Sequence, residues 1–210
     1  MNIDKAYNLW AEQYDTNKNK TRDLDQKVTI KVLEKYEFNT LVELGCGTGK
    51  NTAFFLKKAE KIVGLDFSEG MLKIAKHKIK SEKVNFKQCN LTKAWEIEPN
   101  FADLISCNLT LEHIKNLNFI FEQANNTLKD VGYFFVCELH PFKQYLGSKA
   151  RFETENGTQE LQTFTHHASE YIDAAQNNGF QLLELNEWFD NREAEKSVPR
   201  LISFVFKKIN

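Results

Sequence analysis

Short apolar runs separate longer amphipathic stretches in the first half of the chain. Residues 41–45 and 61–65 are continuous apolar runs, and residues 84–88 alternate between polar and apolar positions. Continuous runs are typical of parallel strands covered on both faces, and alternation is typical of a half-buried strand. Apolar positions at helical spacing fill the intervals between them. The pattern predicts an α/β fold in which strands and helices alternate.

The same patterning predicts the other elements. An amphipathic helix is expected over residues 3–14, and Ser68 is placed to cap a helix that ends near Lys80. Gly179 follows a periodic stretch and indicates the end of a helix. The remaining predictions are a helix ending near Tyr36, a short helix over 49–59, a strand ending at 106–109, a strand over 132–138, a helix over 168–178, and an antiparallel pair at 180–187 and 201–206.

A glycine-rich turn joins the first two strands. Gly45, Gly47 and Gly49 allow the backbone to turn tightly and to approach a ligand closely. The helix that follows points its free N–H groups at this turn. Asp66 lies 21 residues after Gly45, about the offset at which a carboxylate binds ribose hydroxyls in such units. The segment therefore predicts a site for a nucleoside-bearing cofactor.

Two common cofactor motifs fit this turn poorly. A dinucleotide-binding turn has the pattern G-x-G-x-x-G, and Lys50 occupies the third glycine position. A P-loop needs glycine where this chain has Leu44 and a hydroxyl residue where it has Asn51. Neither NAD nor ATP is therefore the expected ligand.

Four segments in register resemble one family. Glu43 to Gly49 (Glu-Leu-Gly-Cys-Gly-Thr-Gly) resembles the E-x-G-x-G-x-G motif I of class I S-adenosylmethionine (SAM)-dependent methyltransferases, and residues 65–72 resemble their second motif. Residues 101–114 and 128–136 are similar to the fourth strand and to the helix–turn–fifth strand. The resemblance implies a Rossmann-like, doubly wound, seven-stranded sheet, mostly parallel with an antiparallel last strand, beneath N-terminal lid helices.

The resemblance also implies a set of SAM-binding residues. Asp66 corresponds to the acidic residue that holds both ribose hydroxyls, and Arg22 corresponds to a basic residue that can meet the SAM carboxylate. Asn90 stands where the family usually has an aspartate for the adenine amine, and its carbonyl oxygen can still accept from an amine. The full expected set is Tyr14, Arg22, Glu43, Gly45, Cys46, Gly47, Thr48, Asp66, Phe67, Met71, Asn90, Leu91, Asn108 and Leu109.

The acceptor pocket is expected outside the carboxyl ends of the fourth and fifth strands. His113 and His140 follow these strands and are the candidate bases for an acceptor that must lose a proton. Tyr7 and Trp10 belong either to the lid over the pocket or to the buried stripe of their helix. Residues 142–167 form an acceptor-shaping insertion or a covering flap. The candidate acceptor-binding residues are Tyr7, Trp10, Glu138, Phe142, Tyr145, Phe152 and His166.

Composition narrows the possible partners. The net charge of −1 gives no general reason to bind nucleic acid or an anionic membrane, and no long apolar span is present. The four cysteines lack C-x-x-C spacing, so neither a zinc site nor a disulfide framework is expected. We expect one methyltransferase domain over residues 1–210, with lid helices in 1–38, that is cytoplasmic and a monomer or homodimer.

The function expected from the resemblance is SAM-dependent methyl transfer to a small-molecule acceptor, and oxygen is favoured over nitrogen as the acceptor atom. Two alternatives stay open. One is a carboxyl methyltransferase that acts on a carrier-bound acid, and the other is a SAM-binding module without catalytic activity. Asn108-Leu109-Thr110-Leu111 lacks the N-P-P-[YFW] or D-P-P-[YFW] motif of base amino methylation, which argues against a nucleic-acid substrate.

Overall fold

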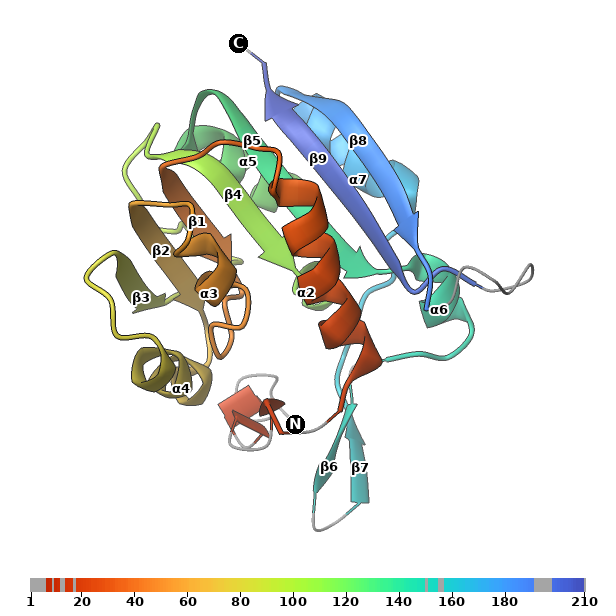
Figure 1. Ribbon diagram of the computed structural model, residues 1–210. Coiled ribbons are helices and arrows are strands. Elements are labelled where there is room, and N and C mark those ends of the chain that lie inside the picture. The colour runs from red at the N-terminus through yellow and green to blue at the C-terminus, as the bar shows by residue number, and fades with distance from the viewer. Residues whose placement is uncertain are drawn as a thin grey trace.

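A seven-stranded sheet forms the centre of the molecule (Figure 1). The computed structural model describes residues 7, 8, 10, 11, 14–16, 18–149, 151–154, 157–190 and 198–209, with only the backbone given for 151–154, 158 and 159. The strand order is β3-β2-β1-β4-β5-β9-β8. The strands are β1 (Thr40–Leu44), β2 (Lys61–Asp66), β3 (Val84–Gln88), β4 (Ala102–Asn108), β5 (Leu128–Leu139), β8 (Phe180–Trp188) and β9 (Leu201–Lys208).

The direction of the strands confirms the predicted topology. β1 pairs in parallel with β2 and with β4, and further parallel pairs join β2 to β3 and β4 to β5. β9 is antiparallel to both β5 and β8. The sheet is therefore mostly parallel with an antiparallel last strand, and the crossover from β3 to β4 opens a crevice at the carboxyl ends of β1 and β4.

Helices cover both faces of this sheet (Figure 1). The helices are α2 (Lys20–Leu33), α3 (Thr52–Phe55), α4 (Glu69–Lys78), the 3-10 turn η1 (Leu111–His113), α5 (Leu117–Thr127), α6 (Pro141–Tyr145) and α7 (Ala168–Asn177). Among the described residues, none of these helices has the length and apolar character needed to cross a bilayer.

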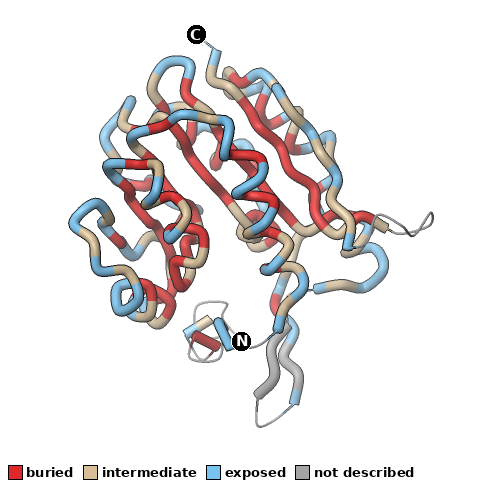
Figure 2. Tube along the Cα trace, in the orientation of Figure 1, coloured by how far each residue is buried: buried red, intermediate tan, exposed pale blue. Residues whose placement is uncertain are grey.

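Alternate strand residues supply two separate cores, because successive side chains of a strand point to opposite faces. Leu41 and Leu104 pack with α2 and α3 on one face. Val42 and Ile105 pack with α5 and α7 on the other face. β1, β2, β4 and β9 are accordingly buried almost throughout, whereas the edge strands β3 and β8 are mostly half-buried or exposed. Exposed residues otherwise lie on the outer surfaces of the helices and in the loops (Figure 2). This two-sided burial explains the continuous apolar runs of β1 and β2.

Three segments differ from the sequence-based expectations. The helix expected over 49–59 is only the four-residue α3, because turns occupy the residues on either side of it. The insertion forms α6 and a hairpin of β6 (Arg151–Thr154) and β7 (Gly157–Glu160), which projects from the body of the molecule (Figure 1). Within the predicted N-terminal helix, the described residues 7, 8, 10, 11 and 14 are helical, and the others lie outside the described residues.

Candidate active site

A cavity of about 610 Å³ lies at the carboxyl ends of β1, β2 and β4. Its volume is in the range of small-ligand sites. It combines backbone of the glycine turn, one carboxylate and several apolar side chains. The lining residues are Tyr7, Tyr14, Gly45, Gly47, Asp66, Phe67, Met71, Gln88, Cys89, Asn90, Leu91, Thr92, Asn108, Leu109, Thr110, His113 and Ile114.

The glycine turn has the geometry that its sequence predicts. Gly45 has a φ of +67°, and a Cβ at this position would lie 2.0 Å from Oγ1 of Thr110. A side chain is therefore excluded by backbone conformation and by contact. The Gly47 N–H donates to Oδ2 of Asp66 at 2.8 Å, and the Ser68 N–H donates to Oδ1 of Asp66 at 2.8 Å. These bonds hold the Asp66 carboxylate between the glycine turn and the N-terminus of α4.

Aromatic residues from the N-terminal segment cover this cavity. The ring of Tyr7 makes edge contacts with Phe67 and His113, each with 5.6 Å between ring centroids. Two polar side chains hold the segment in place. The Asn8 carboxamide oxygen accepts from the Gly70 N–H at 2.8 Å, and the Thr48 hydroxyl donates to Asp15 at 2.8 Å. The segment therefore forms a lid fixed to α4 and to the glycine turn.

A second cavity of about 620 Å³ adjoins the first. The two share Tyr7, Tyr14 and Leu109 as lining residues. The second cavity extends between the N-terminal end of α2 and the segment that follows α6. Its other lining residues are Trp10, Lys18, Asn19, Lys20, Thr21, Arg22, Glu112, Leu139, Leu146, Gly147, Ser148, Lys149 and Arg200.

His113 lies in the wall of the first cavity with both ring nitrogens engaged. Nδ1 is 3.2 Å from the backbone oxygen of Gln162, which can only accept, so Nδ1 holds the proton. Nε2 is 2.9 Å from the Tyr7 hydroxyl. Burial lowers the pKa of His113 from 6.5, and the bond to Gln162 opposes this shift. A neutral imidazole with a basic Nε2 therefore faces Tyr7, a residue that lines both cavities.

Three buried glutamates surround the site. Burial raises the pKa of Glu43 to about 8, that of Glu138 to about 8 and that of Glu112 to about 7. Oε1 of Glu138 accepts from the Thr110 and Leu111 N–H groups at 2.9 Å each. This pair of bonds fixes the turn between β4 and η1, and η1 in turn places His113.

Two predicted cofactor residues line the cavity with their side chains committed to protein partners. The Asn90 carboxamide oxygen accepts from the Thr92 N–H at 3.0 Å and from the Thr92 hydroxyl at 2.8 Å. The Asn108 amide nitrogen donates to Asp25 at 2.7 Å and to Thr29 at 2.9 Å. Asn90 therefore shapes a turn beside the cavity, and Asn108 fixes the end of β4 to α2.

Other predicted cofactor residues support the cavity without lining it. Glu43 accepts from the Thr52 hydroxyl at 2.5 Å beneath the glycine turn. Cys46 packs against Leu72 and Phe86 in a separate apolar cluster. Thr48 is committed to the lid through Asp15, as described above. Arg22 lines the second cavity only. Cofactor binding by these four residues stays a prediction, with Glu43, Cys46 and Thr48 placed around the glycine turn and Arg22 in the adjoining cavity.

His140 and His166 have structural positions outside the linings of both cavities. His140 is 3% exposed, accepts from the Phe142 N–H at 3.2 Å to cap α6, and bonds Glu187 at 3.0 Å. His166 donates to the Ile114 oxygen at 2.8 Å. The structure therefore corrects the placement of both histidines, because each has its ring nitrogens directed into the protein framework.

The remaining predicted acceptor-binding residues include some that line a cavity and some that do not. Tyr7 and Trp10 line the second cavity. Oε1 of Glu138 is bonded to the β4–η1 turn while its Oε2 has no hydrogen-bond partner among the described residues, and Phe142 and Tyr145 are 54% and 55% exposed on α6. These three lie outside the linings of both cavities, and their role in acceptor binding stays a prediction. The side chain of Phe152 lies outside the described residues.

Several cavity residues were missed by sequence reasoning. Gln88 is the last residue of β3, Cys89 and Thr92 follow it, and Thr110 and Ile114 flank η1. Their positions after strand ends were available from the sequence, because every ligand-facing loop in such a sheet follows a strand end. Among the described residues, no group of three or more His, Cys, Asp or Glu side chains is arranged to hold a metal ion.

The fold and this cavity define an α/β protein that binds a nucleoside-bearing cofactor at the carboxyl edge of its sheet. The residues present fit SAM. Asp66 suits the ribose hydroxyls, the backbone of Gly45 and Gly47 admits close approach, and Phe67, Met71 and Leu91 offer apolar surface to the adenine.

Comparison with known proteins supports the same assignment. Residues 42–136 match the model of the methyltransferase domain family. An uncharacterized methyltransferase of Emericella nidulans is 29% identical over 87% of this chain and 77% of its own. A ubiquinone biosynthesis O-methyltransferase of Coxiella burnetii is 25% identical over 77% of this chain and 69% of its own. A malonyl-[acyl-carrier protein] O-methyltransferase of Priestia megaterium is 30% identical over 62% of this chain and 48% of its own.

Solved structures share the fold. A Listeria monocytogenes protein assigned to the SAM-dependent methyltransferases has a TM-score of 0.76 at 23% identity, covering 89% of this chain and 97% of its own. The complex of DhpI with S-adenosylhomocysteine (SAH) has a TM-score of 0.76 at 16% identity, covering 98% and 94%. The domain match and these relatives identify a methyltransferase that uses SAM as its cofactor, and the solved structures show that the chain shares the fold of SAM-dependent methyltransferases.

Proposed function

We propose that this enzyme methylates a hydroxyl oxygen of a small molecule and that His113 is the base. The observation that supports this most strongly is the protonation of His113, whose Nδ1 is committed to Gln162 while Nε2 is left basic toward the junction of the two cavities. A hydroxyl needs such a base because it must lose its proton as it attacks.

The cofactor side of the proposal uses the first cavity. Asp66 binds the ribose, and the turn at Gly45 and Gly47 accommodates the rest of the nucleoside beside β1. When bound, SAM supplies a methyl group activated by a sulfonium sulfur. The tethers at Asn8 and Asp15 hold the lid against the cofactor cavity, and the residues around the site hold the acceptor close and aligned, which can contribute roughly 7–11 kcal/mol.

The acceptor side uses the second cavity and its junction with the first. The acceptor oxygen takes the methyl group and gives its proton to Nε2 of His113, from which the proton later leaves to solvent. Tyr7 contacts this nitrogen in the structure, and we infer that it positions the imidazole until the acceptor arrives. The described residues 7, 8, 10, 11 and 14–16 act as part of the lid, and a single methyltransferase domain accounts for the whole arrangement.

A carboxyl acceptor is the second candidate. It is favoured by the similarity to a malonyl-[acyl-carrier protein] O-methyltransferase, whose name assigns it an acid acceptor. A carboxylate is already ionised near neutral pH and needs no base. The role of His113 therefore separates the two candidates.

The proposal is tested by SAH formation in a panel of hydroxyl compounds, carboxylic acids and amines. The expected result is turnover of hydroxyl compounds to methyl ethers, with a large loss of rate in His113→Gln. Turnover to base-labile methyl esters at a rate that His113→Gln leaves unchanged would instead establish the carboxyl acceptor. Methylation of amines alone would overturn both.

A further inference from the structure

We propose that the second cavity binds an anionic group of the acceptor, so that the acceptor is a small organic acid with a carboxylate or a phosphate. This inference rests on the proposed function, because it assigns the far end of the acceptor site. The methyl-accepting oxygen would lie at the Tyr7 end, and the anionic group at the α2 end.

The charges that line this cavity are strongly one-sided. The described part of the lining contains a single carboxyl group, Glu112, and five cationic side chains. The cationic residues are Lys18, Lys20, Arg22, Lys149 and Arg200. The whole chain has a net charge of −1, so this excess of positive charge is local to the cavity. A concave surface of one sign concentrates ligands of the opposite sign.

Some of this charge is already balanced by protein acids. Arg200 is paired with Asp190, and Lys149 is paired with Glu160 at 3.1 Å. The Lys149 pair has both side chains at least half exposed, so solvent weakens it strongly. No ion pair among the described residues involves Lys18 or Lys20, although the charge of Lys20 also acts on Asp190 and helps to lower the pKa of that carboxyl. These two lysines are therefore the cations available to a ligand at the α2 end.

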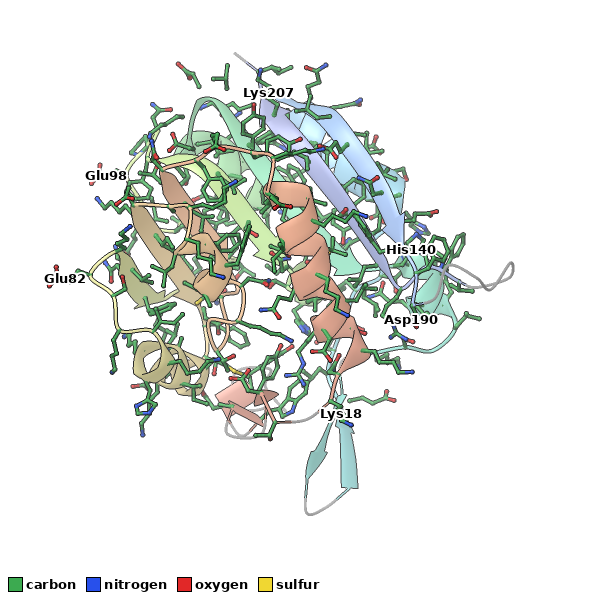
Figure 3. All side chains as sticks on the ribbon, in the orientation of Figure 1. Lys18, Glu82, Glu98, His140, Asp190 and Lys207 are labelled. Carbon is green, nitrogen blue, oxygen red and sulfur yellow. The ribbon has the colours of Figure 1, made fainter. Side chains whose placement is uncertain are left out.

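The N-terminal end of α2 strengthens the positive potential. This 14-residue helix begins at Lys20, and Asn19, Thr21 and Arg22 lie in the cavity wall beside it. The partial positive charge of a helix N-terminus favours anions within its first turn. Lys18 lies next to this end of the helix in Figure 3. Lysine charge and helix charge thus act at the same place.

Arg22 is a fixed element of this wall. It is 8% exposed, donates to the Tyr14 backbone oxygen, and lies 3.9 Å from the centroid of the Tyr14 ring. Its guanidinium also lies 5.5 Å from the centroid of the Trp10 ring. Stacking of this kind holds a guanidinium in place without cancelling its charge.

The apolar part of the lining suits the carbon skeleton of the acceptor. Aromatic and aliphatic side chains make up this part, and three of them, Tyr7, Tyr14 and Leu109, also line the cofactor cavity. The residues are Tyr7, Trp10, Tyr14, Leu109, Leu139 and Leu146. An acceptor that carries an apolar body, a hydroxyl and an anionic group matches this combination of surfaces.

The test uses ligand binding, so that no turnover is required. The wild-type enzyme is saturated with SAH, and saturation-transfer NMR then measures the binding of benzoate, phenyl phosphate and neutral benzamide. Lys18→Gln/Lys20→Gln removes the two available charges. Lys57→Gln/Lys80→Gln removes two exposed lysines outside both cavities and is the control of equal charge.

We expect at least one of the two anions to bind the wild-type enzyme and the control about tenfold more tightly than benzamide, and to lose this preference in Lys18→Gln/Lys20→Gln. The stronger of the two anions identifies carboxylate or phosphate as the group. Equal binding of benzamide and both anions, or an anion preference that persists in the lysine variant, would overturn the inference. Failure of SAH to bind the wild-type enzyme would instead overturn the proposed function.

Discussion

The hydroxyl of Tyr7 lies 2.9 Å from Nε2 of His113, although 106 residues separate the two in the sequence. The bond joins the lid to the loop after β4 at the boundary of the two cavities. Because Nδ1 of His113 already donates to Gln162, the Tyr7 hydroxyl is the donor and Nε2 is the acceptor. The direction of this hydrogen bond from the lid therefore depends on the protonation state of the candidate base, His113.

The first prediction concerns removal of this base. His113→Gln should lower kcat about a hundredfold to ten-thousandfold for a hydroxyl acceptor, because a glutamine amide cannot take up the proton that Nε2 accepts. SAH affinity should stay within a few fold, since Asp66 and the glycine turn remain. Steady-state kinetics and SAH titration of the variant measure the two effects. Unchanged kcat would rule out His113 as the base.

The second prediction separates Tyr7 from His113. Tyr7→Phe keeps the ring contact with Phe67 and removes only the hydroxyl bond to Nε2. We expect a loss in kcat of about tenfold or less, since a neutral hydrogen bond contributes roughly 0.5–1.5 kcal/mol. A loss in Tyr7→Phe as large as that in His113→Gln would show that Tyr7 itself transfers the proton.

The third prediction is the pH dependence of methylation. Protonated His113 cannot act as a base, so kcat/KM should fall as pH decreases through its pKa, which burial places below 6.5. Glu112 lies 4.0 Å from Nε2, and burial raises its pKa to about 7, so its ionisation adds a second step near neutral pH. Comparison of wild type with Glu112→Gln separates the two steps. An acidic limb that vanishes in Glu112→Gln would contradict the assignment to His113.

Sequence reasoning predicted the strands because burial leaves a local pattern, which is a continuous apolar run in β1 and β2, covered on both faces, and an alternation in the edge strand β3. Val84–Gln88 was predicted to the residue, and the Ala168–Asn177 helix differs by one residue at its end. The cofactor cavity was predicted through Gly45, Gly47 and Asp66, whose roles depend on backbone geometry close to them in sequence.

The acceptor side was predicted less well because long-range contacts define it. His140 and His113 both follow strand ends, and only the pairing of His140 with Glu187 on β8 removes it from the pocket. The cationic cavity joins residues 18–22 to Lys149 and Arg200, which are far apart in the sequence. The hydrophobic periodicity of a single segment does not indicate that residues so far apart in the sequence line one cavity.

The fourth prediction concerns Gly45. Gly45→Ala should destabilise the fold well beyond the roughly 1–2 kcal/mol of an unfavourable positive φ, because its Cβ would overlap Thr110. Gly147→Ala is the matched control, since Gly147 also has a positive φ, of +88°, and a Cβ there meets nothing within 4 Å. Thermal unfolding of both variants measures the difference. Equal melting temperatures would contradict the close contact with Thr110.

The fifth prediction concerns the buried carboxyl of Glu138, whose pKa of about 8 is raised from 4.5 by burial. The folded state then holds a proton that the unfolded state releases, so stability is greatest below about pH 4.5 and declines as pH rises toward 8. Glu138→Gln should flatten this decline, and Glu43 accounts for part of what remains because its pKa is also raised to about 8.

Urea unfolding at about pH 5 and about pH 8 measures how steeply the free energy of unfolding declines with pH. Asp103→Asn is a suitable control, because the pKa of Asp103 is lowered to about 2 and its stabilisation is lost only as pH falls from 3.8 toward that value. Asp103→Asn should leave the decline in the free energy of unfolding between about pH 5 and about pH 8 unchanged. An equal slope in wild type and Glu138→Gln would show that Glu138 is ionised in the folded protein.

The most direct test of the central claim is calorimetric titration of the purified protein with SAM and SAH, with NAD and ATP as controls and Asp66→Ala as the variant. We predict micromolar binding of SAM and SAH, no binding of NAD or ATP, and loss of SAH binding in a folded Asp66→Ala. Binding of NAD or ATP in place of SAM, or SAH affinity that Asp66→Ala leaves unchanged, would contradict the account.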